Sequence, residues 1–302
     1  MESLRERLAR GGLVVGDGAW GTMLMARGLR PGRPPESFVL ERPEVVREVA
    51  LLYLDAGAEL LTTNTFGGSP LSLGSWGLGE RAEEINARAV AIAREAAAGR
   101  AWVQASVGPT GRILAPLGDT EPGEVGEAFA RQIRAQAQAG ADLVCIETMT
   151  DLTEALLAVR AAREMAPGLP VIATMTFDPT PRGFFTMMGV SVERAARALA
   201  EAGADVVGSN CGNGIDRMVA IARELRRFTS LPLAIRSNAG LPETRGGEVV
   251  YPETPELMAG RIPSLLEVGV SIVGGCCGTT PDHVRAFRRV IDARRATAPA
   301  AP

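Results

Sequence analysis

A short sequence motif recurs along this chain and limits the folds available to it. In each copy a helix ends, the backbone turns at a glycine and a strand begins. Three copies occupy residues 55–60, 138–143 and 201–206, and a fainter fourth occupies residues 267–270. The glycine in each copy suits the left-handed conformation that closes a helix. Apolar strand patterns and amphipathic helix patterns alternate between these joints, so the sequence predicts strand–helix units and a parallel sheet.

Eight such units follow a short helix predicted over residues 2–10. The predicted strands are 13–15, 59–63, 102–107, 143–146, 171–176, 205–208, 233–236 and 270–273, and the predicted helices are 43–56, 80–98, 123–139, 151–165, 191–202, 215–227, 255–268 and 281–293. This pattern predicts an α/β fold, a single (βα)8 TIM barrel over residues 1–295 with a loose Ala/Pro-rich tail at 296–302. An open doubly wound sheet is the alternative, but no Gly-x-Gly-x-x-Gly motif follows the first strand.

Composition excludes several classes of function. A formal net charge of -3 without a basic block argues against nucleic acid or an anionic membrane surface as a partner. The charged N-terminus and the lack of a long apolar run predict a cytoplasmic protein without a membrane segment. All 32 basic residues are arginine, which excludes Schiff-base catalysis by lysine. The one histidine, His283, is expected to be a solvated residue in the first turn of the last helix.

The cysteines carry the strongest chemical signal. Cys276 and Cys277 stand between glycines, directly after the last predicted strand and before the last helix, and Cys211 stands at the end of the sixth strand. Cys145 lies inside an apolar strand and is expected in the core. Because the C-terminal ends of barrel strands meet at one mouth, Cys211, Cys276 and Cys277 are expected to converge on a Zn²⁺ ion. The alternative is a redox pair and unrelated buried thiols.

Three thiolates would leave one zinc position for water or substrate. Such an electron-rich zinc suits the binding of a substrate thiol as its thiolate, which can then attack a carbon electrophile. A zinc hydrolase and a non-catalytic zinc reservoir are the alternatives. Several polar residues are expected beside the cysteines because they also end predicted strands: Asp17, Asn64, Glu147, Asn210 and Asn238.

Five motifs together resemble the homocysteine S-methyltransferase family, over about residues 13–292. They are Asp-Gly-Ala-Trp-Gly-Thr at 17–22, Thr-Asn-Thr-Phe at 63–66, Gly-Ser-Asn-Cys at 208–211, Ser-Asn-Ala-Gly at 237–240 and Gly-Gly-Cys-Cys-Gly-Thr-Thr-Pro-Asp-His at 274–283. The resemblance implies a zinc-dependent barrel that methylates homocysteine to methionine. It also implies that Cys211, Cys276 and Cys277 are the zinc ligands and that Asp17, Gly18 and Glu147 hold the amino-acid group of homocysteine, with Asn64, Asn210 and Asn238 as further substrate-binding candidates.

The methyl donor varies within that family. Gly-Pro-Thr-Gly at 108–111 and Pro-Leu-Gly at 116–118 resemble the homocysteine-binding module of cobalamin-dependent methionine synthase most, which implies a methylcobalamin donor. The chain is expected to lack folate, cobalamin and activation modules, so a separate corrinoid protein is expected to dock on the barrel mouth. The 177–190 loop is a candidate docking or lid surface, and the long 239–253 loop is expected to line the mouth. S-methylmethionine, S-adenosylmethionine or betaine as donor, and another small thiol as acceptor, are the alternatives.

Overall fold

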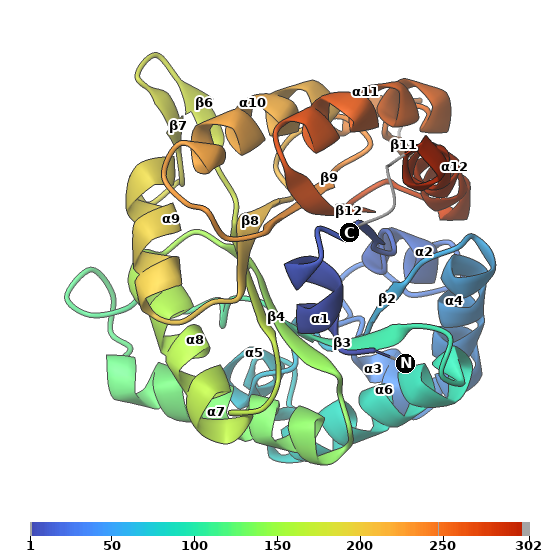
Figure 1. The fold of residues 1–302 in the computed structure, drawn as a ribbon. Helices are drawn as coiled ribbons and strands as arrows, with labels where there is room; N and C mark the ends of the chain where they lie inside the picture. The colour runs from blue at the N-terminus through green and yellow to red at the C-terminus, as the bar shows by residue number, and fades with distance from the viewer. Residues whose placement is uncertain (1, 247, 298–302) are drawn as a thin grey trace.

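Eight parallel strands form a barrel that a ring of helices surrounds in the computed structural model (Figure 1). The structure describes residues 2–246 and 248–297. The barrel strands in chain order are β1 (Val14–Val15), β2 (Leu60–Thr62), β3 (Trp102–Val107), β4 (Leu143–Met149), β5 (Val171–Met175), β8 (Val206–Asn210), β9 (Leu233–Ser237) and β12 (Val270–Gly275). The outer helices are α4 (Pro43–Asp55), α6 (Ala82–Ala97), α7 (Pro122–Gln138), α8 (Leu152–Met165), α9 (Val192–Glu201), α10 (Ile215–Arg226), α11 (Pro255–Glu267) and α12 (Pro281–Thr297).

The barrel closes between its first two strands. The sheet runs in the order β1-β12-β9-β8-β5-β4-β3-β2. A parallel bridge joins Gly16 to Leu60, and the Glu59 N–H donates to the Val15 carbonyl over 2.7 Å. The predicted (βα)8 barrel is therefore confirmed, and the open sheet is excluded.

The repeated glycine joints have the conformation that their sequence predicts. Gly57, Gly140 and Gly203 have φ angles of 97°, 94° and 101°, and Gly269 in the fainter copy has a φ of 88°. The left-handed region favours glycine because other side chains clash with the backbone there. Each joint thus ends a helix and redirects the chain into the next strand.

Several short elements were not predicted. They are α2 (Gly21–Met25), α3 (Ser37–Glu41), α5 (Pro70–Gly74), the 3-10 helix η1 (Gly79–Arg81), and the hairpins β6–β7 (Asp178–Thr180, Gly183–Phe185) and β10–β11 (Glu243–Arg245, Glu248–Val250). All of them lie in connections that leave the C-terminal end of a barrel strand. They build up the mouth side of the barrel, where the site lies.

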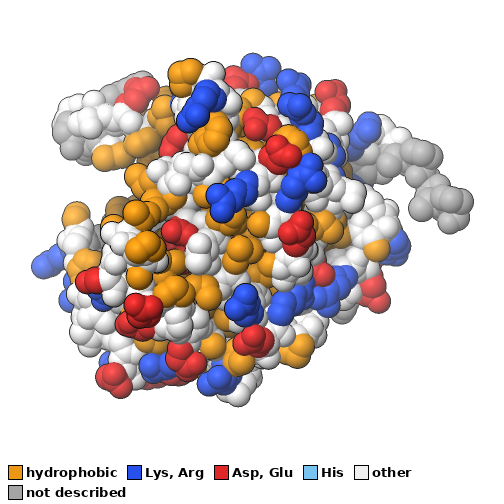
Figure 2. Space-filling view, turned by 90° about the vertical axis from the view of Figure 1, so that its left-hand side faces the viewer, with side chains coloured by type: hydrophobic (Ala, Val, Ile, Leu, Met, Phe, Trp, Pro, Cys, Tyr) orange, Lys and Arg blue, Asp and Glu red, His pale blue; other side chains and the backbone are white. Residues whose placement is uncertain are grey.

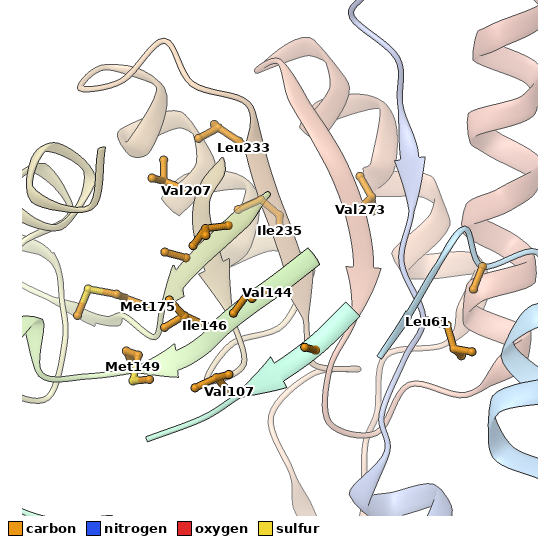
Figure 3. Close-up of a cluster of buried hydrophobic side chains, with 14 of the residues drawn as sticks. Leu61, Val107, Val144, Ile146, Met149, Met175, Val207, Leu233, Ile235 and Val273 are labelled. Atoms are coloured by element: carbon orange, nitrogen blue, oxygen red, sulfur yellow. The ribbon is translucent and has the colours of Figure 1, made fainter. Parts of the chain in front are cut away.

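Apolar side chains fill two layers. The outer layer lies between the strands and the helices and includes Ile146, Val207 and Ile235 (Figure 3). The inner layer fills the N-terminal half of the barrel with alternate residues of all eight strands, among them Leu60 and Trp102. Helix α1 (Leu4–Ala9) lies over this end of the barrel in Figure 1, and its Leu4 joins the inner layer. The inner layer and helix α1 therefore close the N-terminal end of the barrel.

The last described element, helix α12, belongs to the outer ring of helices. Helix α12 continues to Thr297, so the first residues of the predicted tail at 296–302 are helical. Residues 298–302 lie outside the described part of the chain. Among the described residues, no helix has the length and apolar character that crossing a bilayer requires.

Candidate metal centre

Three cysteine side chains converge at the mouth of the barrel. Cys211 directly follows β8, and Cys276 and Cys277 directly follow β12. Their Sγ atoms all lie within 4.8 Å of one another, and those of Cys211 and Cys277 are 3.9 Å apart. Only β9 separates β8 from β12 in the sheet, so cysteines far apart in sequence become neighbours.

The backbone leaves the strand conformation to aim these sulfurs together. Cys211 has a φ of 61°, which is left-handed and strained for a residue with a side chain. Gly278, directly after Cys277, has a φ of 79°, and a Cβ atom there would lie 2.1 Å from Cγ of Tyr251. The Cys276 N–H donates to the Ser237 carbonyl over 2.8 Å, which fixes the turn against β9.

Without a metal, the three thiols share one negative charge. Hydrogen bonds from Cys276 and Cys277 lower the pKa of Cys211 to about 3. The hydrogen bond to Cys211 raises the pKa of Cys277 to about 11 and contributes most to a pKa of Cys276 well above its usual range. A bound cation would have to displace the two remaining protons, as thiolate sites for metals do.

Two asparagines complete the surroundings of the sulfurs. Asn238, after β9, donates to Cys211 through its amide, and its Oδ1 atom is buried without a hydrogen-bond partner among the described residues. The three thiolates are soft donors of the kind that zinc prefers, and they leave one position of a tetrahedral site open. The residues present therefore fit zinc. Asn210 Nδ2 donates to the Thr148 hydroxyl over 2.7 Å and lies 3.8 Å from Cys276 Sγ, so it helps to orient this thiol.

Asp17 lies fully buried beneath the cysteines, and both of its oxygens are occupied. Oδ1 accepts from Thr62 Oγ1 over 2.7 Å and from Arg236 Nη2 over 2.6 Å. Oδ2 accepts from the Thr62 backbone N–H over 2.7 Å and from Trp20 Nε1 over 3.0 Å. This carboxylate thus ties the end of β1 to β2 and β9.

Glu147, at the mouth end of β4, is the second buried carboxylate. Ser106 Oγ donates to its Oε1 over 2.6 Å, and its Oε2 lies 3.6 Å from Arg236 Nη1 without a hydrogen bond. Burial raises the pKa of Glu147, whereas the Arg236 charge and the Ser106 hydrogen bond oppose the rise. Glu147 therefore presents one open oxygen on the mouth side of a polar layer.

Arg236, on β9, is a site residue that the sequence reasoning missed. Although burial opposes its charge, Glu147 and Asp17 hold the pKa of Arg236 above its usual value. The available signal was a charged residue within the apolar strand Leu-Ala-Ile-Arg, at an alternate position that faces inward. A charged side chain in the barrel interior needs groups of opposite charge, and Asp17 and Glu147 provide them for Arg236.

The other predicted residues lie in different places. Gly18 packs beside the β12–α12 turn, where a Cβ atom would lie 2.7 Å from Thr279 Oγ1. Asn64 is buried, but its amide donates to the Pro35 carbonyl over 2.8 Å, away from the cysteines. Cys145 is only 1% exposed, as predicted, and burial raises its pKa far above that of a free thiol.

The prediction that His283 is solvated is wrong, since this side chain is only 5% exposed. Its Nδ1 accepts from the Thr280 N–H over 3.1 Å, and its Nε2 lies 3.0 Å from the Glu253 carbonyl. This pattern requires the neutral ring with the proton on Nε2. His283 thus connects the turn after the cysteine pair to the 239–253 loop, which also carries Tyr251.

Exposed apolar side chains gather around the same mouth. Among the described residues, ten large hydrophobic side chains are exposed, and every one lies between the end of a barrel strand and the first turn of the following helix: Met25, Phe66, Trp76, Ile113, Leu117, Met187, Met188, Leu241, Val249 and Leu257. Figure 2 shows hydrophobic side chains on the left of the view, where the surface is hollowed. We call these ten residues the apolar rim.

A (βα)8 barrel with three converging thiols above a buried acidic layer has a donor set that could hold a metal ion at the end where barrel enzymes have their active sites. The family model described as homocysteine S-methyltransferase matches residues 14–291. The chain belongs to the homocysteine S-methyltransferase family, as its motifs predict.

The curated relatives include two methionine synthases. The one from Mycobacterium leprae is 33% identical over 94% of this chain, and the one from Mycobacterium tuberculosis is 33% identical over 90% of it. The matched region spans 24% of the length of each relative. The metallated homocysteine methyltransferase MmuM from Escherichia coli aligns with a TM-score of 0.80 at 24% identity, covering 95% of this chain and 99% of its own, which is a likeness of fold.

Proposed function

We propose that this protein is a zinc-dependent methyltransferase that transfers a methyl group to the thiolate of homocysteine and so forms methionine. The observation that carries this proposal is the cluster of Cys211, Cys276 and Cys277, whose sulfurs lie within 4.8 Å of one another at the barrel mouth. Family membership and the two methionine synthase relatives support the choice of substrate.

We assign different residues to the thiol end and to the amino-acid end of the substrate. The three cysteines would hold zinc and leave one position for the substrate thiol. Zinc at this position supplies the charge that keeps a substrate thiol deprotonated near neutral pH. The acidic layer that contains Asp17 and Glu147 supplies the negative charge that we assign to the substrate ammonium, and the turn at Gly18 lies beside it. In the transfer, a carbon–sulfur bond forms as the bond between the methyl carbon and its donor breaks.

For the methyl donor, we propose methylcobalamin carried by a separate corrinoid protein that docks on the apolar rim. Exposed apolar surface commonly marks an interaction site, and these residues follow the same ends of the barrel strands as the thiols do. The predicted 177–190 docking loop contributes Met187, which follows the β6–β7 hairpin and is 78% exposed. The methionine synthase relatives also favour a corrinoid donor over a small sulfonium or ammonium compound.

The test is a methyl-transfer assay with zinc-loaded protein and homocysteine. Methylcobalamin, S-methylmethionine, S-adenosylmethionine and betaine are offered separately, and methionine is quantified. Methionine from methylcobalamin alone supports the proposal in full. Methionine from one of the small donors would support homocysteine as the methyl acceptor but would replace methylcobalamin as the proposed donor. Binding of zinc without methionine from any donor, including protein-bound methylcobalamin, would contradict the proposed reaction.

A further inference from the structure

The guanidinium of Arg236 crosses the interior of the barrel just below the metal centre. Glycines on β12 and directly after β1 lie close to it: a Cβ atom at Gly274 would lie 3.4 Å from Arg236 Cγ, and one at Gly16 would lie 4.0 Å from Arg236 Nε. Arg236 is 6% exposed, and its Nε and Nη1 atoms are buried without hydrogen-bond partners among the described residues. The barrel therefore makes room for a resident cation between its two acidic strand ends.

The two carboxylates are not equivalent partners of this cation. Asp17 is fully buried and accepts four hydrogen bonds, including the 2.6 Å bond from Arg236 Nη2. Glu147 is 8% exposed, and its Oε2 atom faces Arg236 Nη1 at 3.6 Å, too far for a hydrogen bond. An incoming ammonium group would find an open acceptor on Glu147 and none on Asp17.

The charges of Asp17, Glu147 and Arg236 also favour different roles for the two carboxylates. Two carboxylates and one guanidinium leave a single negative charge in this layer, which matches a single ammonium. Without the guanidinium, two buried carboxylates would face each other across the barrel, and one of them would take up a proton instead. The Arg236 charge thus opposes the rise that burial gives to the pKa of Glu147.

We propose that Arg236 is a positioning residue that fixes Glu147 as the side-chain acceptor for the substrate ammonium, while Asp17 anchors Arg236 and does not contact the substrate. This inference rests on the proposed function, because it takes the acceptor to be an amino-acid thiol. It adds the residue that sets the preference for an ammonium-bearing thiol over the same thiol without that group.

The test is calorimetric titration of the zinc-loaded protein with homocysteine and with γ-mercaptobutyrate, which is homocysteine without its amino group. The wild type is expected to prefer homocysteine by about tenfold or more, the usual effect of one charge-assisted hydrogen bond in a buried site. Arg236→Met and Glu147→Gln are each expected to lose this preference. The double variant should lose no more than either single variant, because the two residues act as one unit. Arg236→Lys should restore part of the preference.

Controls separate this role from a merely structural one. Zinc stoichiometry should stay unchanged in Arg236→Met, since Arg236 is not a metal ligand, and γ-mercaptobutyrate titration of the same variant measures any loss of affinity that does not depend on the ammonium. Should this variant fail to fold with Asp17 left unpaired, the Asp17→Asn, Arg236→Met double variant removes both charges and should show the same lost preference.

Two results would contradict this inference without contradicting the proposed function. An unchanged preference in folded Arg236→Met would show that Arg236 does not position Glu147, and tighter homocysteine binding would show that the guanidinium competes with the ammonium. If the zinc-loaded wild type binds neither thiol, the proposed function fails and this inference fails with it.

Discussion

At the scale of single residues, Cys276 is one of the three thiols that make up the candidate metal centre. It lies within reach of both other sulfurs and receives the Asn210 amide at 3.8 Å. We expect Cys276→Ala to lower zinc content from about one ion per chain to near zero, because two cysteines leave a tetrahedral site incomplete. Methyl transfer to homocysteine should be lost with the metal.

Metal analysis after dialysis checks this prediction, with Cys145→Ala as the matched control. Cys145 is a buried thiol that lies outside the cluster, so its variant should keep full zinc content. Retained zinc and turnover in Cys276→Ala would rule out the proposed mechanism.

From the burial of His283 we predict that the free energy of unfolding depends on pH. Burial lowers its pKa in the folded protein below the usual 6.5. The unfolded chain therefore takes up this proton more readily, so the free energy of unfolding should decrease as the pH falls below about 6.5 and level off below the folded pKa. His283→Gln keeps an acceptor and a donor in the side chain but cannot titrate, so it should lack this contribution.

Urea unfolding of both proteins between pH 5 and pH 8 measures the difference, in which the contributions of other titrating groups cancel. A wild-type minus variant difference that does not change with pH would contradict the assignment of a neutral, buried His283.

Residue types at strand ends made part of the site predictable. Cysteines on glycine-rich turns after β8 and β12 could be placed together because parallel strands share one mouth. The partners of Arg236 and His283 could not be foreseen, because they depend on which side chains cross the barrel interior and on how the 239–253 loop folds back. Local sequence contains neither of these relations.

At the scale of elements, the turn between β12 and α12 needs glycine at position 278. Gly278 combines a φ of 79° with a close approach to Tyr251, where a Cβ atom would lie 2.1 Å from Cγ. We expect Gly278→Ala to lower the free energy of unfolding by about 1–3 kcal/mol, through backbone strain and displacement of Tyr251. Zinc affinity should also fall, since Cys277 is the preceding residue.

Gly189→Ala is the matched control for this turn. Gly189 has a φ of 76°, but no atom lies within 4 Å of the added Cβ, and it stands in another loop. Denaturant titration and competition with a zinc chelator compare the two variants. Equal zinc affinity in both would show that the turn does not position Cys277.

The eight long strand–helix units were predictable because glycine joints and amphipathic periodicity are local signals. The short helices α2, α3 and α5 and both hairpins were not, since such elements contain too few residues for a clear period and form by packing on the barrel mouth. The prediction therefore described the scaffold better than the loops that surround the site.

At the scale of the whole molecule, the apolar rim gives the barrel one end suited to a partner. If a corrinoid protein docks there, Met187→Glu should raise the KM for protein-bound methylcobalamin about tenfold, because it places a charge in an apolar contact. The rate with free methylcobalamin should stay unchanged, since Met187 does not touch the thiols.

Gln138→Glu, an exposed change of equal charge at the end of α7, tests for effects of net charge alone. Steady-state assays with both donor forms provide the measurement. An equal effect of Met187→Glu on free and protein-bound donor would place the defect in the site rather than in docking.

The position of the three sulfurs also has a mechanical consequence. Cys211 and the Cys276–Cys277 pair extend from β8 and β12, two strands that flank β9 and do not pair with each other. A zinc ion held by all three would act as a cross-link over the mouth end of β9. Because a ligand that binds only the folded state stabilises it, metal-free and metal-loaded molecules would melt at different temperatures. A partly loaded preparation would then show two thermal transitions, and their relative heights would report its zinc occupancy.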